Sequence, residues 1–548
     1  MARKTPATDS HQELHTSSGT LKTSRTPEGT SRTPETCRVL EKGAALPSAV
    51  PQISGPVQPV ADPFVPLCVD LDGTLVKSDT LVDSTLALAR QHPSLLLQLP
   101  RWLSQGKAAL KRHITSSVEL DVVHLPYNRE LLQFLEQQHA IGRPIYLATA
   151  ADAALAQRVA DHLGLFAGIL ASDGSTNLAG PNKHAAFQER FGSNFCYIGN
   201  AIPDLPLLCA CVQPMVANPT RSLSSGLHSA RVTLHRTFSE TTPAPKAWLK
   251  AIRLHQWAKN VLLFLPLLLA HTRSLGLLAG AAVAFLSFGL CASATYIIND
   301  LLDIEADRLH PRKRRRPFAS GDLSAIHGIA IVALFFVAAA ALALAVPRVI
   351  AAISPALSLA HPYSFVEWLA FYTATTLAYS LRLKRAILID VIVLSGLYTI
   401  RILAGSAATG VEVSTWLAGF SIFFFLSLAF VKRFAELENL KARGGVTSKG
   451  RGYHIDDIEQ LRSFGSASAY ASVVVFTLYI SNLSNATELY RHNTRLWLLV
   501  PVLLLWLSRL WLLASRGHLD EDPVVYAITD KRSLALGVIV VAIVLSAL

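Results

Sequence analysis

Cysteine is scarce in this chain of 548 residues, and the few cysteines present are not spaced like metal ligands. The six are Cys37, Cys68, Cys196, Cys209, Cys211 and Cys291. Their spacing excludes a zinc module built from paired cysteines. We interpret them as isolated thiols.

The first 60 residues lack aromatic side chains and are rich in Ser, Thr, Pro and Gly. Such a segment cannot bury enough apolar surface to offset the entropy of ordering it, which predicts a disordered tail over 1–60. The segment also lacks the apolar core of a secretory signal peptide. We therefore expect the N-terminus to stay in the cytosol.

The remainder divides into two parts of different composition. Residues 61–237 have the composition of a soluble α/β domain, whereas 238–548 contain repeated apolar runs of bilayer-spanning length. The fold predicted is multidomain: an N-terminal α/β domain followed by an all-α membrane bundle of about nine spans. The spans are expected near 248–271, 277–298, 325–346, 365–381, 386–405, 415–431, 466–481, 495–513 and 533–548.

The net charge of +12 is compatible with a nucleic-acid partner, but its distribution argues against one. Lys and Arg concentrate in alternate loops between the apolar runs, as the positive-inside bias requires. This pattern predicts a multi-pass protein of the inner (plasma) membrane, with its soluble domain in the cytosol and no nucleic-acid partner. The oligomeric state is left open.

Three aspartates lie at the cytosolic end of the second predicted span. Asp300, Asp303 and Asp307 have the i, i+3, i+7 spacing that places side chains on one helix face. Three ionised carboxylates at a membrane edge need a cation, and Mg²⁺ prefers hard oxygens and commonly bridges carboxylates to phosphates. The basic run His310–Pro317 follows, and it can offset the charge of a departing diphosphate. The competing interpretation is a solvated helix end before a positive-inside loop.

The stretch Asn299–Asp307 followed by His310–Pro317 resembles the first signature of the UbiA superfamily of intramembrane prenyltransferases, whose fold has nine helices. Further segments resemble the decaprenyl-phosphate phosphoribosyltransferase branch. These segments are 253–260, 379–384 with Asp390-Val391, 401–405, 432–437, 451–453 and 522–524. The resemblance covers about residues 245–548.

The resemblance implies transfer of 5-phosphoribose from 5-phosphoribosyl diphosphate to a polyprenyl phosphate. Mg²⁺ on the three aspartates would bind the diphosphate, Lys313, Arg316 and Lys384 would grip phosphates, and Asn299 would orient a ligand or hydroxyl. The matched segments also place substrate-binding residues at Lys259, Tyr379, Asp390, Arg401, Lys432 and Arg433. Asp390 has two interpretations: contact with ribose or a second metal, or an ion pair with Lys384 or Arg385.

Two other functions are alternatives for the membrane part. The aromatic prenyltransferases of the superfamily usually carry a second Asp-rich motif late in the chain. Asp520-Glu521-Asp522 with Asp530 lacks that pattern, which favours phosphoribosyl transfer and leaves aromatic prenylation as the alternative. Transporters keep their charges near the bilayer midplane, whereas these charges gather at one face, which disfavours transport.

In the soluble domain, residues 67–72 form a predicted apolar strand that ends in Asp70 and Asp72 and is followed by Gly73 and Thr74. This resembles the first motif of the haloacid dehalogenase-like (HAD) phosphatases. In that chemistry one carboxylate attacks phosphorus and the other serves as acid and then base.

Later elements of the HAD pattern follow in order along the chain. Thr149 would hold phosphoryl oxygens, and Lys183 stands where the third motif places its lysine. Asn200 occupies a position where Asp is common, so Asp204 with Asp70 and Asp72 would form the metal site. The helical stretch 81–132 is expected to be a small cap.

The two resemblances together predict a bifunctional enzyme of cell-envelope lipid synthesis. Its soluble domain would remove the 5-phosphate of the lipid product or act on a related phosphate. An inactive scaffold retained for docking is the competing interpretation, given Asn200. A P-type pump is excluded because those pumps carry Lys where Asp72 stands.

Overall fold

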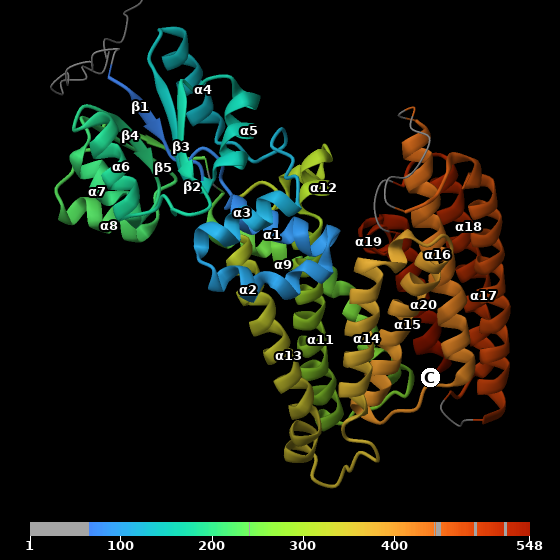
Figure 1. Ribbon diagram of the computed structural model, residues 1–548. Helices are drawn as coiled ribbons and strands as arrows, with labels where there is room; N and C mark the ends of the chain where they lie inside the picture. The colour runs from blue at the N-terminus through green and yellow to red at the C-terminus, as the bar shows by residue number, and fades with distance from the viewer. Residues whose placement is uncertain (1–64, 241, 443, 445–450, 487–489, 520–522) are drawn as a thin grey trace, which may run out of the picture. The chain divides into compact units, whose positions relative to one another are not determined.

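The computed structural model describes residues 65–240, 242–442, 444, 451–486, 490–519 and 523–548. The tail predicted over 1–60 lies outside these residues. Residues Ala61–Leu548 form one compact unit, which contains an α/β domain and a helical bundle (Figure 1). The two parts of the predicted fold class are therefore both present.

The α/β domain is built on a six-stranded sheet in which every strand pair is parallel. Its order is β3-β2-β1-β4-β5-β6, with β1 (Leu67–Val69), β2 (Ile145–Asp152), β3 (Gly168–Ser172), β4 (Cys196–Gly199), β5 (Gln213–Ala217) and β6 (Arg236–Phe238). Because β1 is buried on both faces, it reads as a continuous apolar run rather than an alternating one. The strand order reverses between β1 and β4, and ligands of open parallel sheets bind at such a point.

Five helices accompany the strands, and four further helical segments form an insertion. The helices of the domain are α4 (Arg129–Ala140), α5 (Ala153–Leu163), α6 (Pro181–Phe191), α7 (Leu205–Ala210) and α8 (Arg221–Ser229). The insertion comprises α1 (Thr80–Gln91), η1 (Pro93–Gln98), α2 (Leu99–Ser104) and α3 (Lys107–Ser117). It has its own small core, in which Leu88, Trp102 and Ile114 are buried. This insertion is the helical cap that the sequence predicts, and it ends before α4.

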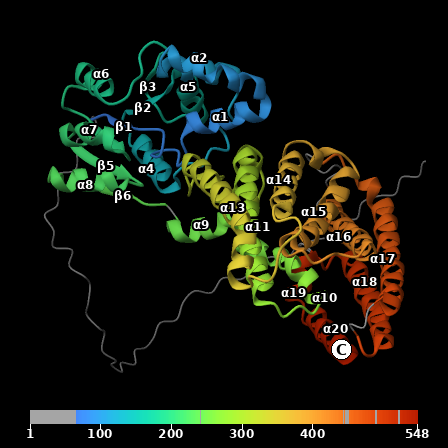
Figure 2. The same ribbon diagram turned by 90° about the horizontal axis from the view of Figure 1, so that it is seen from below.

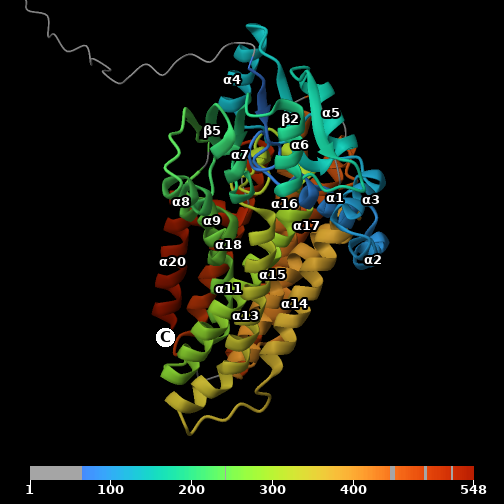
Figure 3. The same cartoon turned by 60° about the vertical axis from the view of Figure 1, so that its left-hand side comes forward.

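The bundle begins at α9 (Ala244–Ile252), and its long helices are seen along their length in Figure 3 and from below in Figure 2. From there to the middle of the bundle, the elements are η3 (Leu254–Phe264), α10 (Leu265–Leu269), α11 (Leu275–Leu302), α12 (Ile304–Leu309), η4 (Lys313–Arg315), α13 (Ala325–Ile353), α14 (Ser364–Leu381), η5 (Leu383–Arg385) and α15 (Ile389–Thr409). The rest are α16 (Thr415–Lys441), η6 (Ile455–Asp457), α17 (Ile458–Ala486), η7 (Asn493–Leu498), α18 (Leu499–Ser515), α19 (Pro523–Thr529) and α20 (Lys531–Ala547). The most extensive packing joins α11 to α13 and α16 to α17.

Within the described residues, six helical segments are long and apolar enough to cross a membrane. They are Leu275–Leu302, Ala325–Ile353, Ile389–Thr409, Thr415–Lys441, Ile455–Asn482 and Asn493–Ser515. This is a multi-pass integral membrane protein, and these segments correspond to six of the about nine predicted spans. Helices α14 and α20 lie where two further spans are expected but are shorter or less apolar.

The first predicted span, 248–271, is not a continuous α-helix. It is divided into α9, the 3₁₀ segment η3 and α10. Arg253 interrupts it with a left-handed backbone (φ 55°), and Pro266 stands in the first turn of α10. A proline there cannot donate to a preceding turn, so the helix begins anew at that point.

The cap contacts the bundle through a buried ion pair. Arg308, in α12, donates to Oδ2 of Asp83 at 2.8 Å and to Oγ of Ser78 at 3.1 Å. Lys77 lies 3.7 Å from Oδ1 of Asp322. Residues that flank the Asp-rich motif are thus bonded to residues just after the Asp70–Thr74 motif.

Candidate functional site

A pocket of about 300 Å³ lies inside the bundle, where η3, α11, α14, α15 and α16 meet. Its lining is dominated by basic and phenolic side chains. The polar lining residues are Arg253, Gln256, Lys259, Thr295, Tyr296, Asn299, Tyr372, Thr376, Tyr379, Ser380, Tyr398, Arg401 and Lys432. Five residues predicted from widely separated motifs therefore meet in one pocket. These are Lys259, Asn299, Tyr379, Arg401 and Lys432.

Arg401 is the most firmly fixed cation of this pocket. Its side chain is buried, and it donates to Oδ1 of Asn260 at 3.0 Å and to the hydroxyl of Tyr372 at 3.1 Å. It also donates to the carbonyl of Leu397 at 2.5 Å. All three partners are neutral, so the guanidinium keeps its full positive charge. A buried cation held by neutral groups attracts an anionic ligand.

The aromatic rings of the pocket also face its cations. Lys259 Nζ lies 5.4 Å from the centre of the Tyr398 ring, and Arg253 lies 5.3 Å from that of Tyr296. Such cation–π contacts orient a charged side chain without neutralising it. The pocket can therefore bind phosphate groups through several directed donors.

The Asp-rich motif lies beside this pocket and is joined to it by Arg253. Arg253 Nη2 lies 2.5 Å from Oδ1 of Asp300. Arg316 Nη1 lies 3.0 Å from the same oxygen and 2.7 Å from Oδ2 of Asp307. Two of the three predicted carboxylates thus meet at a single cationic nitrogen.

Asp303 does not join that meeting point, which corrects the prediction that three carboxylates converge. It pairs with Lys384, whose Nζ lies 2.9 Å from Oδ2 of Asp303. The helical spacing of the motif holds only on an unbroken helix, whereas α11 ends at Leu302 and α12 begins at Ile304. Arg316 and Lys384, predicted to grip phosphates, instead hold carboxylates in this structure.

The residues of the motif fit a divalent cation as a pair. Among the described residues, no group of three or more His, Cys, Asp and Glu lies close enough together to hold a metal ion. Mg²⁺, however, is usually bound by one or two carboxylates and completed by substrate phosphates. Asp300 and Asp307 supply such a pair, already converging on the positive charge of Arg316. Burial raises the pKa of Asp307, while Arg316 opposes that shift.

Asp390 and Arg433 are among the predicted substrate-binding residues that lie outside the pocket lining. Asp390 is fully buried and pairs with Arg433, whose Nη2 lies 2.8 Å from its Oδ2, and Tyr453 donates to its other oxygen. Arg433 also pairs with Glu436. Of the two interpretations of Asp390, pairing with Lys384 or Arg385 is replaced by pairing with Arg433. Its partner comes from α16, which sequence spacing could not indicate.

Lys313 and the acidic residues between 520 and 530 are the remaining predicted residues of the membrane part. Lys313 is half-buried in η4, and its charge favours the ionised form of Asp307. Asp520, Glu521 and Asp522 lie outside the described residues. Asp530 caps α20 and pairs with Arg509 at 2.7 Å, so it serves a local structural purpose.

In the soluble domain, the predicted residues gather at the carboxyl ends of the strands. Asp70 follows β1, Thr149 lies in β2, and Asp204 comes shortly after β4. Lys183, from α6, lies 2.7 Å from Oδ1 of Asp70 and 3.5 Å from Oδ1 of Asp204. The structure thus brings Asp70, Lys183 and Asp204 into contact.

The two aspartates of the first motif differ in their partners. Asp70 accepts from Lys183 and from the Thr74 hydroxyl at 3.3 Å, whereas Asp72 accepts from the backbone N–H of Thr80 at 2.7 Å. Burial raises the pKa of Asp70 to about 6, although the charge of Lys183 opposes it. Burial, with the charge of Asp79, raises the pKa of Asp72 to about 7. The charge of Lys183 therefore favours the ionised form of Asp70, and the charge of Asp79 favours the protonated form of Asp72.

The soluble site does not present the metal ligands that the sequence predicts. Asp204 accepts from the Tyr197 hydroxyl at 2.7 Å and from the N–H groups of Asn200 and Ala201, so both of its oxygens have donors. The cation between Asp70 and Asp204 is Lys183. Thr149 uses its hydroxyl to accept from the N–H of Ala151 at 3.0 Å. The described carboxylates thus fit a lysine-centred site.

Sequence reasoning missed two residues that contribute to these sites. Arg253 belongs to a matched segment, but no spacing rule links it to Asp300. Lys111, from the cap helix α3, donates to the carbonyl of Ala150 at 2.5 Å and to Asn177 at 2.8 Å. It lies near Asp72 and Asp70, whose charges raise its pKa, although burial lowers that pKa overall. Only the folding of the cap over the sheet brings it there.

Comparison with known proteins gives matches over most of the chain. Residues 261–529 match the model of the UbiA prenyltransferase family. The uncharacterized protein y4nM of Sinorhizobium fredii is 38% identical over 87% of this chain and 90% of its own length. The nodulation protein NoeC of Azorhizobium caulinodans is 34% identical over 52% of this chain and 88% of its length. A decaprenyl-phosphate phosphoribosyltransferase of Mycolicibacterium smegmatis is 31% identical over 44% of this chain and 72% of its length.

Proposed function

Because this chain belongs to the UbiA prenyltransferase family, we propose that its membrane domain transfers 5-phosphoribose from 5-phosphoribosyl diphosphate to a polyprenyl phosphate. The observation that carries the proposal is the pocket in which Arg253, Lys259, Arg401 and Lys432 converge beside the Asp300–Asp307–Arg316 cluster. Both substrates of this reaction are phosphorylated at the reacting end. Four convergent cations suit two such ligands, and one of the named relatives carries this activity in its name.

The transfer needs no nucleophile from the protein. The phosphate oxygen of the lipid attacks the anomeric carbon of the ribose, and the bond from that carbon to the diphosphate breaks with its electron pair. The chain contributes orientation and charge: Arg401 and Lys259 hold phosphate groups, and Asn299 and the phenols fix hydroxyl groups. The lipid's prenyl chain extends into the apolar surroundings of the bundle.

Mg²⁺ would be held by Asp300 and Asp307, and it would neutralise the leaving diphosphate. Arg316 now lies where their oxygens meet, so it must move aside or share them when the cation binds. Arg253 connects this pair to the pocket. The basic loops on the same side as the motif support a cytosolic position for the whole site.

The direct test is an assay with purified full-length protein in nanodiscs. Radiolabelled 5-phosphoribosyl diphosphate, Mg²⁺ and polyprenyl phosphate should give a labelled lipid, and Asp300→Asn should not. Prenylation of an aromatic acid in place of lipid labelling would contradict the proposal and identify an aromatic prenyltransferase. A matched control is Asp456→Asn, an exposed aspartate that lies outside the pocket lining.

We also propose that the soluble domain hydrolyses a phosphate monoester, such as the 5-phosphate of the lipid product. Asp70 attacks phosphorus, the ester oxygen leaves with the proton of Asp72, and an aspartyl phosphate remains. Asp72 then takes a proton from water, which attacks phosphorus and releases phosphate and Asp70. Lys183 steadies the Asp70 carboxylate and the charge of the phosphoryl oxygens.

Support for hydrolysis is the Asp70–Lys183 pair at the switch point of a parallel sheet, under a helical cap. The full-length protein should release phosphate from ribose 5-phosphate, and Asp70→Asn should abolish release. Asp161→Asn, which changes a side chain bonded to Gln157 on α5, is the control. If wild type and Asp70→Asn are equally inert on a broad panel of phosphates, the scaffold interpretation is correct.

A further inference from the structure

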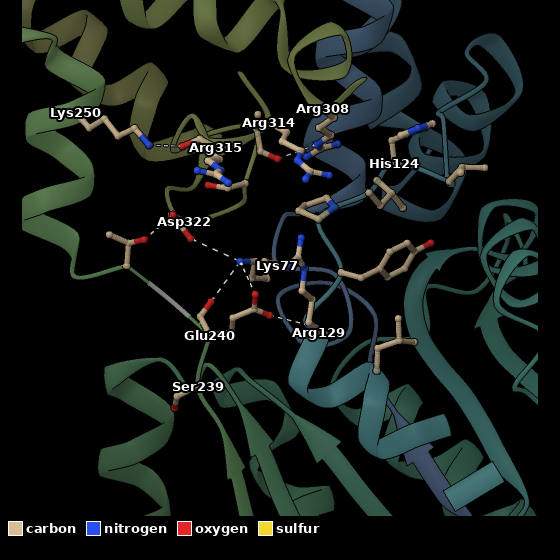
Figure 4. Close-up of a pocket in the computed structure, with 18 residues that line it drawn as sticks. Lys77, His124, Arg129, Ser239, Glu240, Lys250, Arg308, Arg314, Arg315 and Asp322 are labelled. Atoms are coloured by element: carbon tan, nitrogen blue, oxygen red, sulfur yellow. Dashed lines mark hydrogen bonds and ion pairs between the residues drawn. The ribbon is translucent and has the colours of Figure 1, made fainter. Parts of the chain in front are cut away.

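A second and larger pocket, of about 860 Å³, lies where the α/β domain meets the loop after the Asp-rich motif (Figure 4). Its basic lining residues come from both parts of the compact unit. They are Lys77, Arg129, Lys250, Arg308, Arg314 and Arg315. Only Glu240 and Asp322 oppose them in the lining, so the described pocket has an excess of positive charge.

Both carboxylates of the pocket lining already lie near one cation, Lys77. Lys77 Nζ lies 3.7 Å from Asp322 and 4.0 Å from Glu240. Arg308 is committed to Asp83. In the part of the chain that the structure describes, Arg129, Arg314 and Arg315 have no carboxylate within ion-pair distance. Figure 4 shows Lys77 joined to Asp322 and Glu240 by dashed lines, with Arg314 on one side of it and Arg129 on the other.

The basic run after the motif divides between two sites. Arg316 turns to Asp300 and Asp307, whereas Arg314 and Arg315 line this second pocket. The leaving-group interpretation of the run therefore covers only part of it. Like charges that converge in a recess repel one another, and an anion with several oxygens removes that repulsion.

We propose that this pocket binds a phosphate monoester, at a site separate from the Asp-rich motif and from Asp70. Guanidinium groups match phosphate because their planar donors contact two oxygens at once. The volume exceeds that of a bare phosphate and lies in the range of sites for small organic ligands. Ser239 in the lining offers a hydroxyl group to a sugar, whereas the hydroxyl groups of Thr242 and Ser320 donate to Asp322 and to the carbonyl of Pro317. The ligand class is a sugar phosphate, either dissolved or carried on a lipid.

The site is tested by chemical protection in full-length protein, embedded in nanodiscs of phosphatidylcholine. Ribose 5-phosphate should protect Arg314 and Arg315 from phenylglyoxal, as measured by peptide mass spectrometry, and ribose should not. The exposed neighbour Arg312, which is outside the pocket lining, should stay reactive. Equal protection of Arg312, or none at any of the three, would overturn the proposal.

Variants give a second measurement on the Asp70→Asn background, where the ligand is not hydrolysed. Arg314→Gln with Arg315→Gln should weaken ribose 5-phosphate binding about tenfold or more, since two charge-assisted contacts are lost. Arg312→Gln should leave binding unchanged. If Arg312→Gln weakens binding equally, the loop is only a general basic surface and the site does not exist.

Nanodiscs of different lipid composition show whether the bound phosphate belongs to a lipid headgroup or to a dissolved ligand. Protection by polyprenyl phosphate in the nanodisc, without added sugar, assigns a lipid headgroup; protection by dissolved ribose 5-phosphate alone assigns a free ligand. Either result supports the site. Asp300→Asn should keep the protection while abolishing lipid labelling, so a failed transfer assay and a failed binding site are distinguishable.

Discussion

Arg308 donates to Asp83 at 2.8 Å, with both side chains almost fully buried. One partner follows Asp307 of the Asp-rich motif directly, and the other lies in the first helix of the cap. Thr80, at the start of that helix, donates to Asp72. A short series of bonds therefore links the acid of the soluble site to the carboxylates of the membrane site.

The Arg308–Asp83 pair should matter most when only one partner is removed. Arg308→Met leaves a buried carboxylate without its cation and should destabilise the fold by about 3–5 kcal/mol. The double variant with Asp83→Leu should recover most of that loss. Denaturant unfolding in detergent measures the change, and hydrogen exchange should quicken in α1 and α12. Arg158→Met is the control, because Arg158 pairs at 3.9 Å with the exposed Glu119. A loss of stability in Arg158→Met as large as that in Arg308→Met would contradict this prediction.

Two adjacent residues of α16 should behave oppositely. Lys432 lines the pocket, so Lys432→Gln should raise KM for 5-phosphoribosyl diphosphate about tenfold and leave unfolding unchanged. Arg433 is buried against Asp390, so Arg433→Met should lower stability by about 3–5 kcal/mol. Steady-state kinetics measure KM for each variant, and denaturant unfolding measures its stability. A stable Arg433→Met protein with raised KM would return that residue to the substrate site.

The soluble domain should show a bell-shaped dependence of kcat/KM on pH. Its nucleophile must be ionised, so the rate rises with pH through the Asp70 pKa of about 6. Its acid must be protonated, so the rate falls above the Asp72 pKa of about 7. Phosphate release between pH 4 and 9 gives the profile. Asp72→Asn should remove the alkaline limb, and a flat profile would show that these groups do not act as assigned.

Removal of the divalent cation should stop lipid labelling. EDTA should abolish labelling, and added Mg²⁺ should restore it. Without a divalent cation, the carboxylates of Asp300 and Asp307 carry the same sign of charge as the diphosphate and cannot bind it. Asp307→Asn should lower kcat about a hundredfold or more, by loss of a charge contact at the leaving group. Labelling that persists undiminished in EDTA would contradict the role given to these carboxylates. Asp456→Asn, an exposed aspartate outside the transfer pocket, is the matched control.

Short-range patterns in the sequence were sufficient for the elements and for the residues that lie close along the chain. The apolar stretch ending in Asp70, and Thr149 at the next strand along, indicate the edge of a parallel sheet because carboxyl ends of parallel strands meet there. Apolar runs of bilayer length indicate the membrane part because lipid admits only helices and closed barrels. The Asp-rich spacing indicated Asp300 and Asp307, which the structure brings together at Arg316.

The sequence by itself determined that strand ends and apolar helices exist, since both follow from local periodicity and composition. Only the tertiary structure decided which charges meet. Arg316 reaches Asp300 and Asp307 while Asp303 turns to Lys384, because the backbone breaks between α11 and α12. Asp390 pairs with Arg433 of another helix, and Arg314 and Arg315 line the pocket at the α/β domain. Ion pairs between distant segments depend on packing, which no pattern along a single chain records.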